Sequence, residues 1–379
     1  MESPTLAFSE ISPYEDDQVN EVLLKIAQKP SFLNMVQYMF PHLTGKEIQE
    51  GFKYIHSTRA FQALYIHQGI RSILGDSTNG LSYTGIKELD KQQAYLFLSN
   101  HRDIILDSAC LNILLFEHGY DTTHIAIGDN LMVSKLVTSL MKLNKSFIVH
   151  RTPPRKQLLA YSERLSRYIQ HVMQEGQSVW VAQRSGRTKD GFDQTHPGLL
   201  KMLALTFEEE NWQESWRALN LTPMAISYEY EPCDGLKAEE MVHQELDLAY
   251  EKDDKRALIT GIRQPKGRIH LAVGRPLKEE IDTIDLSQNK NQRLKQLAAL
   301  MDQKIYELYK RWPTNYCAAD MLRASAQYQD QYSAAEQGAF EAHLKKTLSK
   351  LQGPQEALRK KLLEIYAGPV LQWEISQEP

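Results

Sequence analysis

The feature that most constrains the fold is a regular alternation of short apolar runs and amphipathic stretches in the middle of the chain. Residues 94–98 are continuously apolar, which is typical of a strand buried on both faces. Residues 104–115 then have helical spacing. Because strands that alternate with helices form crossover units, this pattern predicts an α/β fold. We expect a mixed, mostly parallel sheet covered by helices on both faces, with further strands over 124–127, 147–149, 179–182, 223–227 and 269–273 and helices over 134–143, 155–175 and 198–210.

Helical patterns flank this region on both sides. Apolar residues recur at three- and four-residue spacings from about residue 17 to residue 74, which predicts an N-terminal helical cap. A C-terminal helical tail is expected after Pro313, with breaks at Gly353-Pro354 and Gly368-Pro369. We therefore predict a helical region over 1–78, an α/β domain over 79–313 and a tail over 314–379.

Composition excludes several classes of protein. Forty-eight acidic against 44 basic side chains give a formal net charge of −4, which argues against a nucleic-acid partner. No apolar run approaches the roughly 20 residues that cross a bilayer. The cysteines, Cys110, Cys233 and Cys317, are too scattered for a metal-ligand pair or a disulfide framework. We therefore expect a cytoplasmic protein with no metal and no cofactor.

His101 is the strongest candidate for a catalytic residue. It follows the apolar strand at 94–98 directly, and ligands of open α/β sheets bind beyond the carboxyl ends of strands. A histidine can take a proton from a hydroxyl near neutral pH when a carboxylate orients its ring. Asp107, in the first turns of the next helix, is the predicted orienting residue, because side chains on a helix lean toward its N-terminus. Asp103 is predicted to cap that helix, and it stays open as the alternative orienting residue.

Four sequence blocks in one order carry a resemblance to a known family. A histidine followed by an aspartate at a strand–helix junction resembles the first block of the glycerolipid acyltransferases, although the spacing from Arg102 to Leu106 is longer than usual. The other blocks lie at residues 128–151, 179–189 and 221–227. The third block has Ser185 where a glutamate is commonest, and this variant is similar to the soluble chloroplast-type glycerol-3-phosphate acyltransferases, which also join a helical bundle to an α/β domain.

The resemblance implies the acyltransferase fold and a set of phosphate contacts. By match to the third block, Arg187 and Lys189 resemble the residues that bind the acceptor's phosphate. Arg151, which closes the second block, and Arg184 are the next candidates. Arginine suits this task because its planar fork binds two phosphate oxygens at once.

The activity implied is O-acyl transfer by direct attack of an acceptor hydroxyl, with His101 as general base. The donor would be an acyl carrier protein or coenzyme A thioester, and the acceptor a glycerol-3-phosphate or lysophosphatidic acid type molecule. An amino-acid-derived lipid acceptor, a non-catalytic lipid-binding relative and a hydrolase remain alternatives. The basic, amphipathic stretch at 134–143 leaves open a peripheral contact with anionic lipid at the inner membrane, against the alternative that its apolar side packs on the sheet.

Overall fold

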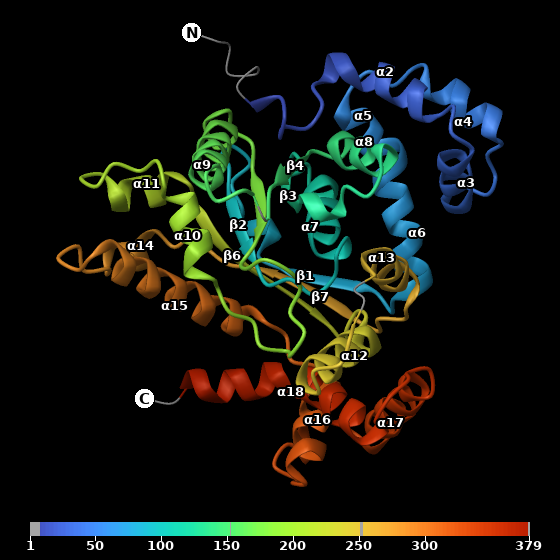
Figure 1. Cartoon of the computed structure of the whole chain (residues 1–379), viewed down its shortest axis with the longest axis vertical. Helices are drawn as coiled ribbons and strands as arrows, with labels where there is room; N and C mark the ends of the chain where they lie inside the picture. The colour runs from blue at the N-terminus through green and yellow to red at the C-terminus, as the bar shows by residue number, and fades with distance from the viewer. Residues whose placement is uncertain (1–7, 152, 251–252, 378–379) are drawn as a thin grey trace.

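The computed structural model describes residues 8–151, 153–250 and 253–377, and its centre is a seven-stranded sheet (Figure 1). The strand order is β1-β7-β6-β2-β5-β3-β4. Every neighbouring pair is parallel except β6 and β7. The predicted α/β fold with a mixed, mostly parallel sheet is therefore confirmed. The strands are β1 Leu81–Thr84, β2 Leu96–Ser99, β3 His124–Gly128, β4 Ser146–Val149, β5 Val179–Ala182, β6 Leu221–Tyr228 and β7 Ile269–Val273.

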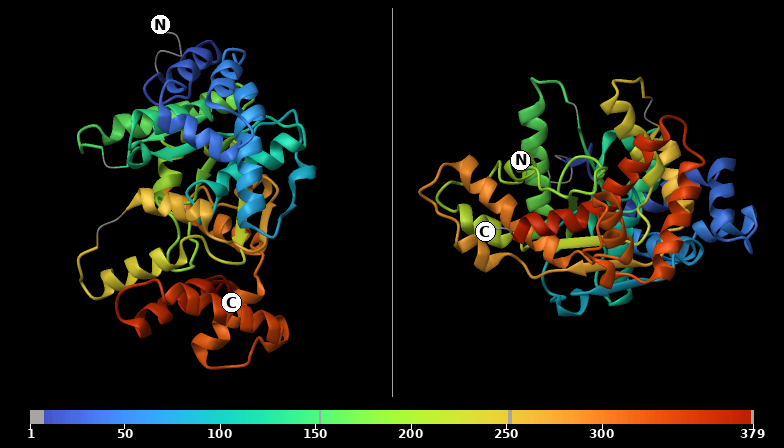
Figure 2. Two further views of the ribbon diagram at one scale, coloured as in Figure 1. Left: turned by 90° about the vertical axis from the view of Figure 1, so that its right-hand side faces the viewer. Right: turned by 90° about the horizontal axis from the view of Figure 1, so that it is seen from below.

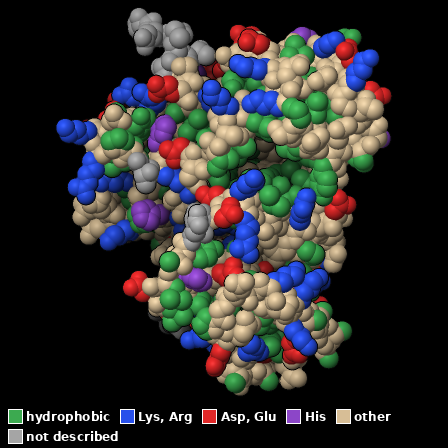
Figure 3. Space-filling view, turned by 45° about the vertical axis from the view of Figure 1, so that its right-hand side comes forward, with side chains coloured by type: hydrophobic (Ala, Val, Ile, Leu, Met, Phe, Trp, Pro, Cys, Tyr) green, Lys and Arg blue, Asp and Glu red, His purple; other side chains and the backbone are tan. Residues whose placement is uncertain are grey.

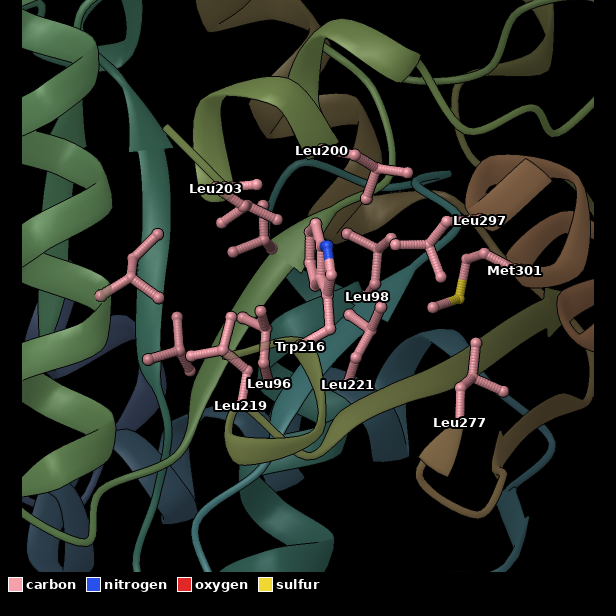
Figure 4. Close-up of a cluster of buried hydrophobic side chains, with 14 of the residues drawn as sticks. Leu96, Leu98, Leu200, Leu203, Trp216, Leu219, Leu221, Leu277, Leu297 and Met301 are labelled. Carbon is pink, nitrogen blue, oxygen red and sulfur yellow. The ribbon is translucent and has the colours of Figure 1, made fainter. Parts of the chain in front are cut away.

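The central strands carry apolar side chains on both faces because helices cover both. One core joins the even-numbered residues of β2, such as Leu96 and Leu98, to the helices of one face (Figure 4). Phe97 points the other way, into a second core with the helices of the opposite face. The first face is covered by α9 Leu158–Gln174, α10 Pro197–Leu203, α11 Trp212–Ala218 and α15 Lys290–Leu308, and the second by α6 His67–Ser77 and α7 Leu106–Glu117.

Helical regions lie at opposite ends of the molecule, as Figure 2 shows. At the N-terminal end, short helices share a core with Leu143 at the end of α8 Lys135–Leu143. At the C-terminal end, the tail helices share a core with α12 Asp234–Glu245. The remaining elements are α2 Asp16–Ile26, α3 Pro30–Met39, α4 Gly45–Phe52, α5 Thr58–Phe61, η1 Gln62–Ile66, η2 Ile86–Glu88, η3 Asp129–Leu131, α13 Asp254–Arg263, α14 Lys278–Asp282, α16 Pro313–Arg323, η4 Gln329–Gln331, α17 Ala334–Leu348 and α18 Gln355–Gln377.

Some element boundaries differ from the sequence predictions. The helix expected over 198–210 ends at Leu203, and the strand β1 was not predicted, because a short edge strand with half its residues exposed has little apolar signal. The expected break at Gly368-Pro369 is wrong, since α18 continues through it. Pro369 lacks an N–H for the carbonyl of Ile365, and that carbonyl lies against the backbone of Gly191.

Candidate active site

The loop that carries His101 is held between the two strands that flank β2. The side-chain amide of Asn100 continues the sheet: its Nδ2 donates to the carbonyl of Ile226 at 3.0 Å, and its Oδ1 accepts the N–H of Ile226 at 2.8 Å. On the other side, the N–H of Thr188 donates to the carbonyl of His101 at 2.8 Å. Because backbone and buried amide groups fix the loop from both sides, His101 has a defined position at the carboxyl edge of the sheet, as predicted from the strand that precedes it.

The structure pairs His101 with Asp107. The Nδ1 atom of His101 lies 2.8 Å from Oδ2 of Asp107, which also accepts the N–H groups of Arg102 at 2.6 Å and Asp103 at 3.0 Å. The other oxygen, Oδ1, accepts the hydroxyl of Tyr228 at 2.7 Å. Asp107 is buried, so these four donors replace its hydration. A carboxylate fixed in this way holds the Nδ1–H tautomer and leaves Nε2 of His101 as the atom that can accept a proton.

Asp103 has a different geometry. Its Oδ1 accepts the N–H groups of Ile105 and Leu106, both at 2.8 Å, at the start of α7. Its Oδ2 is buried against Gly261 of α13 and has no hydrogen-bond partner among the described residues. Asp103 therefore caps the helix and makes no hydrogen bond to His101.

His101 opens into a cavity of about 510 Å³ between the ends of β3 to β5 and the helix α9. The ring of His101 contacts the edge of Trp180 at a centroid distance of 5.7 Å. Most of the wall is apolar, and three arginines, Arg151, Arg164 and Arg184, lie in it with His101. Arg164 is ion-paired with Glu10. The apolar part is formed mainly by Phe147, Val149, Leu165, Ile169, Val181 and Met202. An apolar cavity with His101 and several arginines in its wall suits a ligand that has a hydrocarbon chain and an anionic group.

Arg187 and Lys189 point away from this cavity, toward α12. Lys189 is ion-paired with Glu240. Arg187 lies beside Cys233, and its Nη1 is buried without a hydrogen-bond partner among the described residues. Of the four residues predicted to contact the phosphate, the structure therefore brings Arg151 and Arg184 into the cavity of His101 and leaves Arg187 and Lys189 outside it.

Sequence reasoning missed the residues that support the His101 loop from a distance. Tyr228 follows the fourth block directly. Its position at the end of β6, next to β2, was the only signal that could have placed it near His101. Burial, with the nearby Asp107 carboxylate, raises the pKa of Tyr228 well above its usual value, so its hydroxyl stays a donor. Arg102 is also buried, and its guanidinium binds Asp193 at 2.6 Å and Glu231 at 3.4 Å.

Other chemistries have less support in the described residues. Burial raises the pKa of the Cys110 thiol far above its usual value, so this cysteine is a poor nucleophile. No group of three or more His, Cys, Asp or Glu side chains in the described part of the chain is arranged to hold a metal ion. None of the helices described is both long and apolar enough to span a bilayer.

Comparison with known proteins relates part of the chain to one family. Residues 80–227 match the sequence model of the acyltransferase family, and this segment contains His101, Asp107 and all four predicted cations. Residues 80–227 are therefore similar to this family, and the resemblance drawn from the four blocks is confirmed. The structure is also similar to the crystal structure of the 1-acyl-sn-glycerophosphate (LPA) acyltransferase PlsC from Thermotoga maritima, with a TM-score of 0.36, 11% identity, and coverage of 76% of this chain and 95% of that one. A search among curated proteins returned no significant match.

Proposed function

We propose that this protein transfers a fatty acyl group from a thioester, acyl-coenzyme A or acyl carrier protein, to the hydroxyl of a glycerol-3-phosphate or lysophosphatidic acid type acceptor. The observation that carries the proposal is the hydrogen-bonded set of His101, Asp107 and Tyr228 at the wall of an apolar cavity. His101 is the general base, and Asp107 orients its ring and stabilises the imidazolium that forms.

The reaction needs no covalent acyl-enzyme. Nε2 of His101 accepts the proton as the acceptor's oxygen attacks the thioester carbonyl. The tetrahedral intermediate then collapses, the carbon–sulfur bond breaks, and the imidazolium returns the proton to the leaving thiolate. An ester and a free thiol are formed, so atoms and charge balance. Arg151 and Arg184 are the side chains that we propose to bind the acceptor's phosphate, because both line the cavity of His101.

A second apolar hollow supports an acceptor that carries its own hydrocarbon chain. It has a volume of about 280 Å³ and lies on the opposite face of the sheet, where Ile125 and Ile127 of β3 point, whereas Ala126 and Gly128 face the cavity of His101. Ile104 and Ile105, just after the catalytic loop, line this hollow. Figure 3 shows a hollow with hydrophobic side chains on this side of the molecule. A lysolipid acceptor would use both sites, and contact with an anionic membrane would supply it.

His101→Ala tests the proposal directly. Purified protein is given labelled acyl thioesters and a panel of phosphorylated and unphosphorylated acceptors, and the products are separated as acyl ester or free fatty acid. The wild type should form the ester, and the variant should lose activity by at least about 10²-fold, the usual contribution of a general base. The thermal unfolding of the variant should match that of His56→Ala, a control at an exposed histidine that lines neither the cavity of His101 nor the apolar hollow.

Three results would contradict the proposal. An active His101→Ala variant would exclude the base assignment. Free fatty acid as the only product would identify a hydrolase, and no turnover with any donor would favour a lipid-binding relative. If esters formed only on amino-acid-derived acceptors, the proposed mechanism would stand but the proposed acceptor would be wrong.

A further inference from the structure

A third cavity, of about 670 Å³, lies outside the segment 80–227 that matches the family, between α12, α13 and the C-terminal helix α17. We call it the basic groove, because Arg256, Arg263, Lys346 and Lys350 line it. All four are exposed side chains, and Figure 3, which views the molecule from this side, shows Lys and Arg side chains gathered over its lower part. Cations that converge on one concavity repel each other unless an anion binds between them, so the groove favours an anionic ligand.

Few acidic side chains neutralise these cations. Among the described residues, Arg263, Lys346 and Lys350 have no carboxylate within 4.0 Å, whereas Arg256 lies 3.9 Å from Glu239. Asp234 is the carboxylate among the described residues of the lining, and it is already hydrogen-bonded to other side chains. Its Oδ2 is 2.7 Å from Nε2 of His343 and 2.8 Å from the hydroxyl of Tyr366. The groove therefore presents a net positive charge to a ligand.

The rest of the wall suits the flat ring of a base. Tyr230 stacks on His343 at a centroid distance of 4.4 Å, and both line the groove together with Leu236, Ile259, Pro265 and Leu351. The volume is in the range of small-molecule sites, roughly 300–1,000 Å³. A carrier protein would instead need a broad surface of about 800 Å². The groove thus fits a nucleotide with several phosphates better than it fits an acidic protein.

The groove lies next to the candidate active site. Cys233, in its wall, lies beside Arg187, and Arg187 belongs to the loop 184–190. Ser185 and Gly186 of the same loop line the cavity of His101. One loop therefore separates the two sites. A donor with a phosphorylated nucleotide at one end and a thioester at the end of a flexible arm could use both.

We propose that the basic groove binds the adenosine 3′-phosphate 5′-diphosphate end of an acyl-coenzyme A donor. The proposal rests on the acyl transfer proposed above and assigns its donor: coenzyme A, held by residues after the family segment. Arg256, Arg263, Lys346 and Lys350 bind the phosphates, and the apolar wall beside Tyr230 contacts the adenine.

Charge reversal in the groove tests this assignment. Lys346→Glu with Lys350→Glu should raise the KM for acyl-coenzyme A by about tenfold or more, since a charge-assisted bond to phosphate contributes about that factor. The KM for an acyl-pantetheine thioester, which lacks the nucleotide, and the KM for the acceptor should stay unchanged. The matched control is Lys345→Glu with Lys295→Glu, because Lys345 is the neighbour of Lys346 on α17 but lies outside the groove, and Lys295 is exposed on α15.

A binding measurement separates this proposal from the proposed activity. Adenosine 3′,5′-bisphosphate should bind the wild-type protein and the control in calorimetry, and its affinity should fall by at least about tenfold in the groove variant. Binding of this kind without acyl transfer would contradict the activity and leave the nucleotide site standing. Equal loss with acyl-coenzyme A and acyl-pantetheine would overturn the groove assignment. So would a loss confined to acyl carrier protein as donor, which would identify an acidic protein as the ligand.

Discussion

At the scale of single residues, two aspartates with similar sequence positions have different environments. Asp107 accepts four hydrogen bonds, from His101, two backbone N–H groups and Tyr228. Asp103 accepts only the backbone N–H groups that begin α7. The hydrogen bonds thus favour Asp107 as the partner of the proposed base, and they give Asp103 a structural task.

A pair of substitutions separates these roles. Asp107→Asn should lower kcat by about 10³–10⁴-fold, because an amide in this place can hold the wrong histidine tautomer. Asp103→Asn should keep kcat within a few fold and cost at most about 1 kcal/mol of stability, since asparagine also caps helices well. Steady-state kinetics and urea denaturation of both variants supply the comparison. If Asp103→Asn showed the larger loss of kcat, the assignment would reverse.

At the scale of elements, the tail helix α18 supports the loop that binds Arg102. Gly191, at φ +79°, lies directly on α18, where a methyl group added to Gly368 would come within 2.6 Å of its backbone. The carbonyl of Gly191 accepts Nη2 of Arg102 at 3.1 Å, and Gln372 of α18 accepts the N–H of Asp193 at 2.8 Å. The loop that carries His101 and the tail are therefore coupled through a buried, charged network.

Two glycines in tail helices should respond in opposite ways to alanine. Gly368→Ala should destabilise the protein by about 2 kcal/mol, because its methyl group has no space against the Gly191 backbone. Gly338→Ala, in α17, meets no atom within 4 Å and should stabilise by roughly 0.5–1 kcal/mol through helix propensity. Chemical denaturation of both variants measures the difference. Equal effects would mean that α18 does not pack closely on the loop.

At the scale of the whole molecule, buried groups with opposite shifts set the dependence of stability on pH. Burial lowers the pKa of His124 to about 4, so stability is lost as the pH falls from 6.5 toward 4, where only the unfolded chain takes up the proton. Burial raises the pKa of Asp302 to about 6, although hydrogen bonds from Thr195 oppose this. Asp302 therefore changes stability in the opposite direction. As the pH rises from about 4 to 6, its carboxyl group ionises in the unfolded chain before it ionises in the folded one, and stability is lost.

Asp302→Asn isolates one of these two contributions. Asparagine can still accept the N–H of Thr195, which lies 2.6 Å from Oδ1, but it carries no charge to bury. The variant should therefore be more stable than the wild type at pH 7.5. This gain in the free energy of unfolding should be about 2–3 kcal/mol larger at pH 7.5 than at pH 4, which is the equivalent of two pKa units. Urea denaturation at both pH values measures this difference. The same difference in stability at both pH values would show that folding does not raise the pKa of Asp302.

The sequence predicted the order of strands and helices through the sheet and the place of His101, because both depend on local patterns. A continuous apolar run specifies a buried strand, and the residue after it must lie at the sheet edge. Weak local signals explain the errors. The edge strand β1 has little apolar signal, and α18 continues through Pro369 although proline usually ends or kinks a helix.

By itself, the sequence determined the α/β class, the position of His101 and the resemblance of residues 80–227 to the acyltransferase family, since these follow from residues that are neighbours in the chain. Only the tertiary structure decided which aspartate contacts His101 and which arginines share its cavity. Side-chain direction depends on partners that are distant in sequence: Tyr228 binds Asp107, whereas Glu240 on α12 pairs with Lys189 and holds it away from the cavity. The basic groove was decided in the same way, because its cations come from helices that meet only when the chain is folded.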